Sequence, residues 1–364
     1  MRVALTNRQR IAMALACKSG LDCLPVLPWG LDALAAPPDP SFGPLWHVLL
    51  ERAVIKRRWT GWPDLFAPGP SVERSALVRQ TPEGDRVRVT HLHGPGGELS
   101  QEVQSISGTS ATDTTKRYLK SPADVERYLS WPYQEAVVDA SPYFELEHSV
   151  GERGVVTYRM CDALSFVGEN FDPEPFAMCS VENEDLILTL LEVLAGRIYR
   201  YVQGLLEGGA RPIFVVGGSE FATPPLLGIR HFDDYVVRFD KPLIELMHRY
   251  GCKVIVHCHG RVNSLLERFI AMGVDGLHPL EVPPMGDVTL VEAKRRVGDR
   301  LCFVGNLQIG DMMSATPAEI TEQVRRIREQ APSGMILSTS ATPYETPMTS
   351  HLLENYIAAI EAAA

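Results

Sequence analysis

Apolar positions along the second half of the chain alternate between two periods. Short apolar runs typical of buried strands, such as 212–218 and 253–257, are each followed by stretches with apolar residues three and four positions apart. The clearest of these helical stretches is 184–206, whose apolar stripe is core packing. Because the connections between them are short, we expect parallel strands joined by helical crossovers.

This alternation predicts the fold class. Roughly eight strand–helix units fit between residue 20 and the C-terminus, which favours an α/β fold, a single (β/α)₈ barrel of TIM type. The alternative is an open Rossmann-like sheet, but no G-x-G-x-x-G follows the first expected strand, 24–30. We therefore expect residues 1–364 to form one barrel domain with an N-terminal extension.

The first third of the chain has a different pattern. Thr6 is an expected N-cap for a helix over 7–16. Two partly alternating runs around Gly94-Pro95-Gly96-Gly97 predict a β-hairpin over 85–104, an insertion for which dimerisation and lid closure are both open roles. A helix is expected over 45–58, so its cluster Lys56-Arg57-Arg58 is a solvated helix face or an anion contact.

Composition and charge narrow the class of protein. Hydrophobic residues make up 45% of the chain and charged residues 22%, as in ordinary globular proteins. The formal net charge of −10 argues against non-specific nucleic-acid binding. No apolar run approaches the roughly 20 residues that span a bilayer. The seven cysteines include no C-x-x-C pair and suit a reducing compartment, so we expect a cytoplasmic protein.

Two histidines end one of the clearest predicted strands. His257 and His259 point to the same face of the strand and Cys258 to the other, because side chains alternate. Catalytic residues of α/β barrels gather at such strand ends, although a buried histidine is often only a core residue. Glu220, after the preceding strand, completes a two-histidine, one-carboxylate set that suits zinc or another divalent metal such as iron.

Other polar residues follow the later strands. Glu281 is a candidate fourth ligand or general base, and Tyr344 is a candidate for proton transfer. Asn306 and Ser340 are candidate cofactor contacts. Helix capping explains several such residues equally well, Asp162 and Asn306 above all.

Several of these segments carry a resemblance to a known family. They are Ser219-Glu220-Phe221-Ala222-Thr223-Pro224-Pro225, His257-Cys258-His259-Gly260, the Gly273-Val274-Asp275 turn before His278-Pro279-Leu280-Glu281, and Val304-Gly305-Asn306. Together they resemble the uroporphyrinogen decarboxylase superfamily, which also contains the methylcobalamin:coenzyme M methyltransferases and related corrinoid-linked proteins. The resemblance covers nearly the whole chain, most clearly 210–360, and implies a (β/α)₈ barrel with its site in the C-terminal mouth.

The resemblance is closer to the methyltransferase branch. The Arg-rich segment that follows the first strand of true decarboxylases corresponds to 29–34, which contains no Arg, and only Asp64 loosely matches the decarboxylase aspartate. The methyltransferases bind zinc through a His-x-Cys pair and a late Cys. His257 matches that His, while His259 and Ser340 stand where the thiolates would be. A site with imidazole in place of thiolate donates less charge to the metal.

The resulting hypothesis is a metal-dependent, methyltransferase-like enzyme. His257, His259 and Glu220 would hold the metal, Glu281 or Tyr344 would move a proton, and a corrinoid protein or free cobalamin would donate the methyl group to a small-molecule substrate. A homodimer is the expected assembly. The first alternative is a cofactor-free decarboxylase of a smaller acid, with Asp64 or His259 stabilising the charged intermediate. The second is a non-catalytic barrel that binds a corrinoid or tetrapyrrole.

Overall fold

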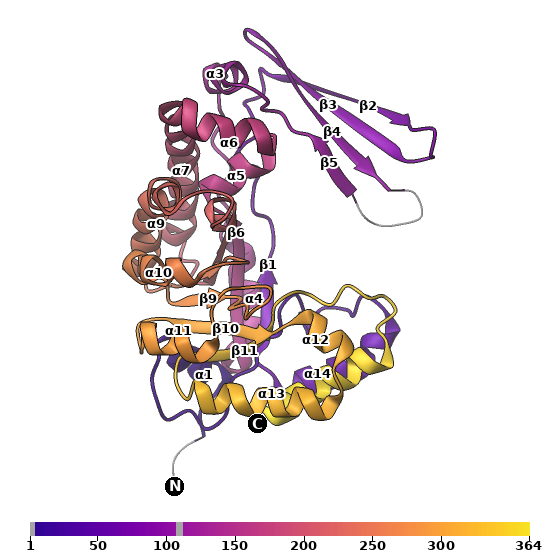
Figure 1. Cartoon of the computed structure of the whole chain (residues 1–364), viewed down its shortest axis with the longest axis vertical. Helices are drawn as coiled ribbons and strands as arrows, with labels where there is room; N and C mark the ends of the chain where they lie inside the picture. Colours follow the sequence, from indigo (N-terminus) through magenta and orange to yellow (C-terminus); the bar gives the residue numbers. More distant parts are fainter. Residues whose placement is uncertain (1–3, 107–111) are drawn as a thin grey trace.

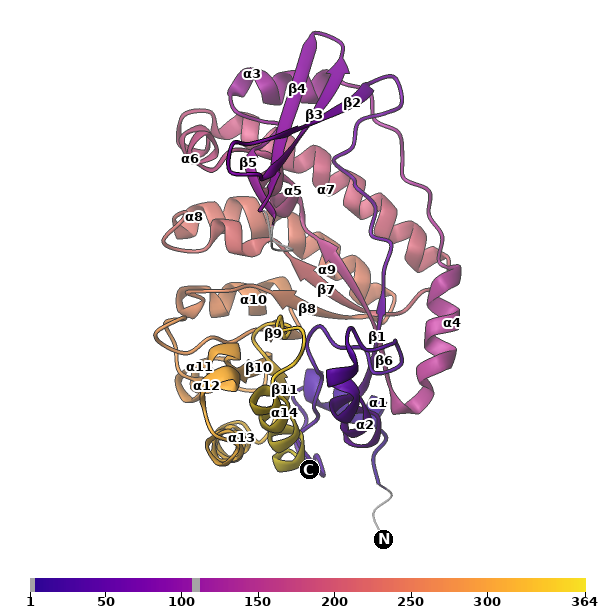
Figure 2. The same ribbon diagram turned by 90° about the vertical axis from the view of Figure 1, so that its right-hand side faces the viewer.

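The centre of the structure is a parallel sheet that follows chain order. A computed structural model describes residues 4–106 and 112–364. Seven strands pair in sequence in this sheet (Figures 1 and 2). They are β1 (Ile55–Trp59), β6 (Gly154–Cys161), β7 (Ile213–Gly217), β8 (Lys253–His257), β9 (Gly276–His278), β10 (Cys302–Leu307) and β11 (Met335–Thr339).

A short N-terminal segment lies between the first and last strands of this sheet. Val26 forms a parallel bridge with Leu337 of β11. The N–H of Val54, just before β1, donates to the carbonyl of Val26 at 2.9 Å. The segment therefore takes the eighth place of the ring, as in a TIM-type barrel. The strand expected over 24–30 is reduced to this bridge, because Pro25 and Pro28 have no N–H to donate to a ladder.

Helices pack along the outer face of the sheet (Figure 1). The helix expected over 184–206 is confirmed to within one residue, since it carries a strong apolar stripe. The α-helices are α1 (Asn7–Leu15), α2 (Gly43–Arg52), α3 (Pro122–Ser130), α4 (Ser141–Val150), α5 (Ala163–Asn170), α6 (Pro173–Glu182), α7 (Glu184–Glu207), α8 (Ile229–Phe232), α9 (Arg238–Arg249), α10 (Leu266–Met272), α11 (Leu290–Val297), α12 (Ile309–Ser314), α13 (Pro317–Gln330) and α14 (Ser350–Ala362). Short 3₁₀ segments are η1 (Pro40–Phe42), η2 (Gly151–Arg153), η3 (Ser219–Ala222) and η5 (Asn263–Leu265), and η4 (Asp233–Val237) is a π-helical turn.

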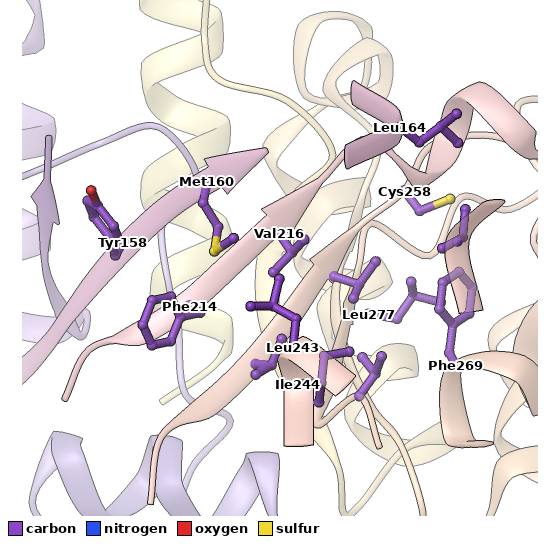
Figure 3. Packing of buried hydrophobic residues seen from close by; sticks show 14 of the residues in the cluster. Tyr158, Met160, Leu164, Phe214, Val216, Leu243, Ile244, Cys258, Phe269 and Leu277 are labelled. Atoms are coloured by element: carbon purple, nitrogen blue, oxygen red, sulfur yellow. The ribbon is translucent and has the colours of Figure 1, made fainter. Parts of the chain in front are cut away.

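The alternation of side chains divides the core into two clusters. Phe214 and Val216 of β7 belong to the larger cluster between sheet and helices, where Figure 3 shows them beside Leu243 and Ile244 of α9. Val215 between them belongs to a smaller inner cluster. The inner cluster also contains residues of β6, β8, β10 and β11, and Ile11, Ala14 and Leu15 of α1. A capping box at Thr6 fixes the start of α1. Apolar packing thus fills the interior next to α1.

A second, antiparallel sheet projects from the barrel (Figure 1). Its order is β2 (Glu73–Gln80), β3 (Arg86–Gly94), β4 (Gly97–Ser105) and β5 (Thr112–Lys116). The β3–β4 pair, in which Gly94 faces Gly97, coincides with the hairpin expected over 85–104. The sheet is larger than that expectation because β2 and β5 have no buried face, so neither has an alternating pattern. Hydrogen bonds from Arg127 and Trp131 to the β3–β4 turn tie this sheet to the α3 region.

The expectation of one helix over 45–58 is wrong. Helix α2 ends at Arg52, and Ala53 is already extended, so Lys56, Arg57 and Arg58 lie on β1. Pairing of β1 with β6 over five residues outweighs the helical propensity of this segment. In the part of the chain that the structure describes, no helix is both long and apolar enough to cross a membrane.

Candidate active site

The histidine at the end of β8 belongs to a buried hydrogen-bonded chain. Nδ1 of His257 lies 2.8 Å from Nδ1 of His278, and Nε2 of His278 lies 3.0 Å from the carbonyl oxygen of Thr339. That carbonyl can only accept, so Nε2 of His278 carries the hydrogen. The Nδ1 lone pair of neutral His278 then accepts the Nδ1–H of His257. This assignment leaves a lone pair on Nε2 of His257.

Both rings of this chain are neutral. Burial lowers the pKa of His257 to about 3, helped by the charges of His259 and Arg159. Burial also lowers the pKa of His278 well below its ordinary value, and neighbouring His257 lowers it further. A neutral ring with a fixed tautomer can act as a hydrogen-bond acceptor or a metal ligand without first losing a proton.

Trp29 covers the histidine chain on one side. Its ring stacks on His278 with a centroid distance of 3.4 Å and on His257 at 5.0 Å. Nζ of Lys56 lies 5.3 Å from the centroid of the Trp29 ring and donates to the carbonyl of Pro28 at 2.5 Å. Burial and then the charge of Arg58 lower the pKa of Lys56 to about 7. Trp29 lies within the expected strand 24–30 and Lys56 within an expected helix, so the sequence offers no reason to place either beside the histidines.

His259 forms an ion pair beside this chain. Its Nδ1 lies 3.2 Å from Oε1 of Glu281, and Oε2 of Glu281 accepts the N–H of Gly260 at 2.8 Å. The hydrogen bond to Glu281 raises the pKa of His259. Burial alone would raise the pKa of Glu281, but the bonds from His259 and Gly260 more than offset it and lower that pKa. The ring of His259 lies edge-on to His257 at 4.7 Å, as expected for two side chains on one face.

The predicted third metal ligand, Glu220, lies nearby on η3. Its charge contributes to the raised pKa of His259, but its Oε2 accepts the N–H of Gly218 at 3.1 Å. Within residues 4–106 and 112–364, no three His, Cys, Asp or Glu side chains are grouped as a metal site. The arrangement therefore fits two imidazole ligands, His257 and His259, and does not present the full set of three.

The remaining predicted residues make other contacts. Ser340 Oγ accepts the N–H of Ile309 at the start of α12, and Asn306 Nδ2 donates to the carbonyl of Leu280. Both thus hold the backbone at the barrel mouth, defined here as the carboxyl ends of the strands.

Asp64 Oδ1 accepts the N–H groups of the two residues at 66 and 67, and its side chain lines a separate cavity of about 370 Å³. Tyr344 is 67% exposed and bonds to Met313. The structure thus brings His257, His259 and Glu281 together, whereas the hydrogen bonds of Ser340, Asn306, Asp64 and Tyr344 within the described residues go to other partners.

Trp29 also lines a cavity of about 560 Å³. It reaches Val215 and Ile255 of the inner cluster, and the C-terminal loop at 342–346 forms part of its wall. Lys56 and Arg58 of β1 and Arg159 of β6 line it. The mouth is therefore rich in cations, even though residues 29–34 contain no Arg.

Comparisons with known proteins agree with this architecture. The methyltransferase from Methanosarcina mazei is 15% identical and has a TM-score of 0.61, over 99% of this chain and 98% of that one. A B12-independent methionine synthase from a Shewanella species is 12% identical with a TM-score of 0.45, over 64% of this chain and 67% of that one. No curated protein matches the chain significantly. The family model described as uroporphyrinogen decarboxylase (URO-D) matches residues 163–355, more than half of the sequence, and the chain belongs to this family.

Proposed function

We propose that this chain is a methyltransferase-like enzyme of the uroporphyrinogen decarboxylase family that acts on a small molecule in the barrel mouth. The observation that carries the proposal is the pairing of two unlike imidazoles 4.7 Å apart. Neutral His257 has a free Nε2 lone pair, and His259 is held by Glu281. Such a pair can bind an acceptor and take its proton. The likeness to the Methanosarcina methyltransferase supports the fold on which this proposal is built.

His259 and Glu281 supply the proton transfer in this proposal. Because Nδ1–H of His259 donates to Glu281, Nε2 of the neutral ring is the basic nitrogen. As the acceptor's sulfur or oxygen bonds to the methyl carbon, the bond between that carbon and its donor breaks. The acceptor's proton passes to Nε2 of His259. The carboxylate of Glu281 stabilises the imidazolium that forms.

The proposed metal is zinc or another divalent ion held by His257 and His259, with Glu220 as the third ligand. Because such an ion would occupy Nε2 of His259, Glu281 would take the acceptor's proton in a metal-bound site. A bound metal would polarise the acceptor and lower its pKa. Within the described residues no group of three metal-ligating side chains is present, so no step above depends on the metal. The proposed donor, cobalamin or a corrinoid protein, rests on the sequence resemblance alone. A homodimer, a cytoplasmic location and a single domain with an inserted hairpin likewise stay predictions.

A cofactor-free decarboxylase is the second candidate, favoured by the cations of the cavity. Arg58 or Arg159 could hold a substrate carboxylate, since guanidinium groups pair with carboxylates through two parallel hydrogen bonds. The electron pair left by departing CO₂ would then accept a proton from the protonated His259. This candidate differs from methyl transfer in its product, which is CO₂.

The test combines metal analysis with turnover. Metal content is measured by mass spectrometry on protein purified without added metal, for the wild type and a His257→Ala, His259→Ala double variant. Methylcobalamin is then supplied with a panel of thiols and alcohols, and its demethylation is followed by absorbance. Methyl transfer that is lost in Glu281→Gln and kept in the exposed-histidine control His148→Ala supports the proposal. Turnover equal in wild type and Glu281→Gln, or release of CO₂ without methyl transfer, contradicts it.

A further inference from the structure

The cavity beside Trp29 carries a positive charge in a chain that is acidic overall. Its lining includes the cations Lys56, Arg57, Arg58 and Arg159 and a single carboxylate, Asp32. The whole chain, in contrast, has a formal net charge of −10. Clefts lined by one sign of charge concentrate ligands of the opposite sign. The local excess of cations therefore needs an explanation in terms of what enters the cavity.

Among the described residues, Arg57 is the one of these four basic side chains that forms an ion pair. Nε of Arg57 lies 3.3 Å from Oδ2 of Asp32, so these two charges offset each other. The Lys56 ammonium donates to a backbone carbonyl. The guanidinium groups of Arg58 and Arg159 have no hydrogen bond or ion pair with any residue that the structure describes. Two unpaired guanidinium groups remain at the cavity wall.

Strand register places Arg58 and Arg159 on the same inner side. Strands β1 and β6 lie side by side (Figure 2), and Arg58 pairs with Thr157 in their parallel register. Thr157 and Arg159 are two residues apart on β6, so their side chains leave the same face. All three line the cavity. Two guanidinium groups from adjacent strands can therefore approach one ligand.

The cation pair is next to the histidine site. In the register of the sheet Arg159 lies opposite Val215 of β7, and Val215 lies opposite Ile255 of β8, two residues before His257, so the side chains of Arg159 and His257 leave the same face of the sheet. Trp29 is shared, since it lines the cavity and stacks on His257. A ligand anchored at Arg58 and Arg159 would thus lie against Trp29, close to the groups assigned above to proton transfer.

We propose that Arg58 and Arg159 form the binding site for the oxyanion group, a carboxylate or a phosphate, of a small organic substrate. Arginine suits this role because its planar fork donates two parallel hydrogen bonds to such groups. Trp29 and Trp46 supply apolar walls of the same cavity for the rest of the molecule. This inference deepens the proposed function, since it names the substrate class of the same mouth.

Binding without turnover tests the site. Succinate, inorganic phosphate and the neutral analogue succinamide are titrated by calorimetry into the wild-type protein and the Arg58→Gln and Arg159→Gln variants. Both arginines are exposed, so neither replacement should prevent folding. The control is Arg325→Gln, which removes an equally exposed charge from α13. We expect either anion to bind, and each mouth variant to weaken it by about ten- to a hundredfold, as for loss of a hydrogen bond between charged groups.

The outcomes separate this inference from the proposed function. Equal affinities in wild type and both mouth variants, an equal loss in Arg325→Gln, or equally strong binding of succinamide would overturn the anion site. Binding of succinate alone identifies a carboxylate, and binding of phosphate alone a phosphate. If anions bind at Arg58 and Arg159 but no methyl transfer is found, the site stands and the methyltransferase proposal fails. If a neutral substrate is methylated and no anion binds, the methyltransferase proposal stands and the anion site fails.

Discussion

Two buried carboxyl groups behind the mouth make stability depend on pH. Asp162, after β6, is 1% exposed, and Asp240 of α9 is 3% exposed. In each, Oδ2 lacks a hydrogen-bond partner within the described residues. Burial raises the pKa of Asp240 from 3.8 to about 7. Burial, and then the charge of Asp240, raise the pKa of Asp162 well above its ordinary value.

Replacing Asp240 with Asn removes one of these titrations. In the unfolded chain Asp240 loses its proton near its ordinary pKa of 3.8, whereas in the folded protein it keeps the proton up to about pH 7. The folded state therefore binds more protons in this window, and the free energy of unfolding falls as pH rises through it. A shift of about 3 units at about 1.4 kcal/mol per unit gives at most about 4 kcal/mol. Between about pH 4 and about pH 7, the free energy of unfolding should fall less in Asp240→Asn than in the wild type, by at most about 4 kcal/mol.

Urea unfolding at about pH 5 and about pH 8 measures most of this difference, about 3 kcal/mol, because about two thirds of the shift lies above pH 5. We expect Asp240→Asn to be more stable than the wild type at the higher pH, where the wild type must bury a charged carboxylate. The matched control is Glu245→Gln, an exposed acid on the same helix, which should follow the wild type. Equal pH dependence in wild type and Asp240→Asn would refute the reasoning, because the buried carboxyl would then not hold its proton.

Three further predictions concern the mouth. Nitrogen NMR of the imidazoles should find the hydrogen of His257 on Nδ1, and a hydrogen on Nε2 would contradict the assigned chain to His278. Trp29→Leu should admit water to the histidine chain and raise the pKa of His257 from about 3, which an NMR titration against the wild type measures. An unchanged pKa would mean that other groups exclude water from the ring. Ser340→Ala should cost about 1 kcal/mol of unfolding free energy, because the N–H of Ile309 loses its acceptor, and should leave methyl transfer intact. A loss of turnover in that folded variant would instead favour the predicted cofactor contact.

The pair of histidines could be predicted because it depends on local order alone. Alternation along one strand puts His257 and His259 on one face whatever the rest of the chain does. The partner of His257 depends instead on the register between two strands, in which His257 lies opposite His278. The sequence does not encode that register in any local pattern, so no pattern identifies His278 as the partner of His257.

The cluster of cations on β1 was recognised, with an anion contact as one interpretation, but its strand was not predicted, for a related reason. The segment around Lys56, Arg57 and Arg58 has no alternation of polar and apolar residues. A barrel strand can carry cations on its inner face where that face borders a cavity, so the inner positions need not be apolar. Its strand character comes from pairing with β6, a contact almost a hundred residues away in sequence. The same limit applies to β2, whose eight residues are all exposed. Periodicity predicts a strand only where one face of the strand is buried and the other is exposed.

The two halves of the mouth have different chemistry, and that division constrains the reaction. Unpaired guanidinium groups come from β1 and β6, whereas the imidazoles and Glu281 come from β8, β9 and the segment after it. Trp29 touches both halves. A substrate bound by its oxyanion at Arg58 and Arg159 would have its other end along Trp29, which lines the cavity and stacks on His257; the imidazoles themselves are not part of the cavity lining. Methyl transfer to that end would leave the anion unchanged, whereas decarboxylation would consume the group that anchors the substrate. A single anionic group held by both arginines therefore favours methyl transfer, and decarboxylation requires a substrate with a second carboxylate.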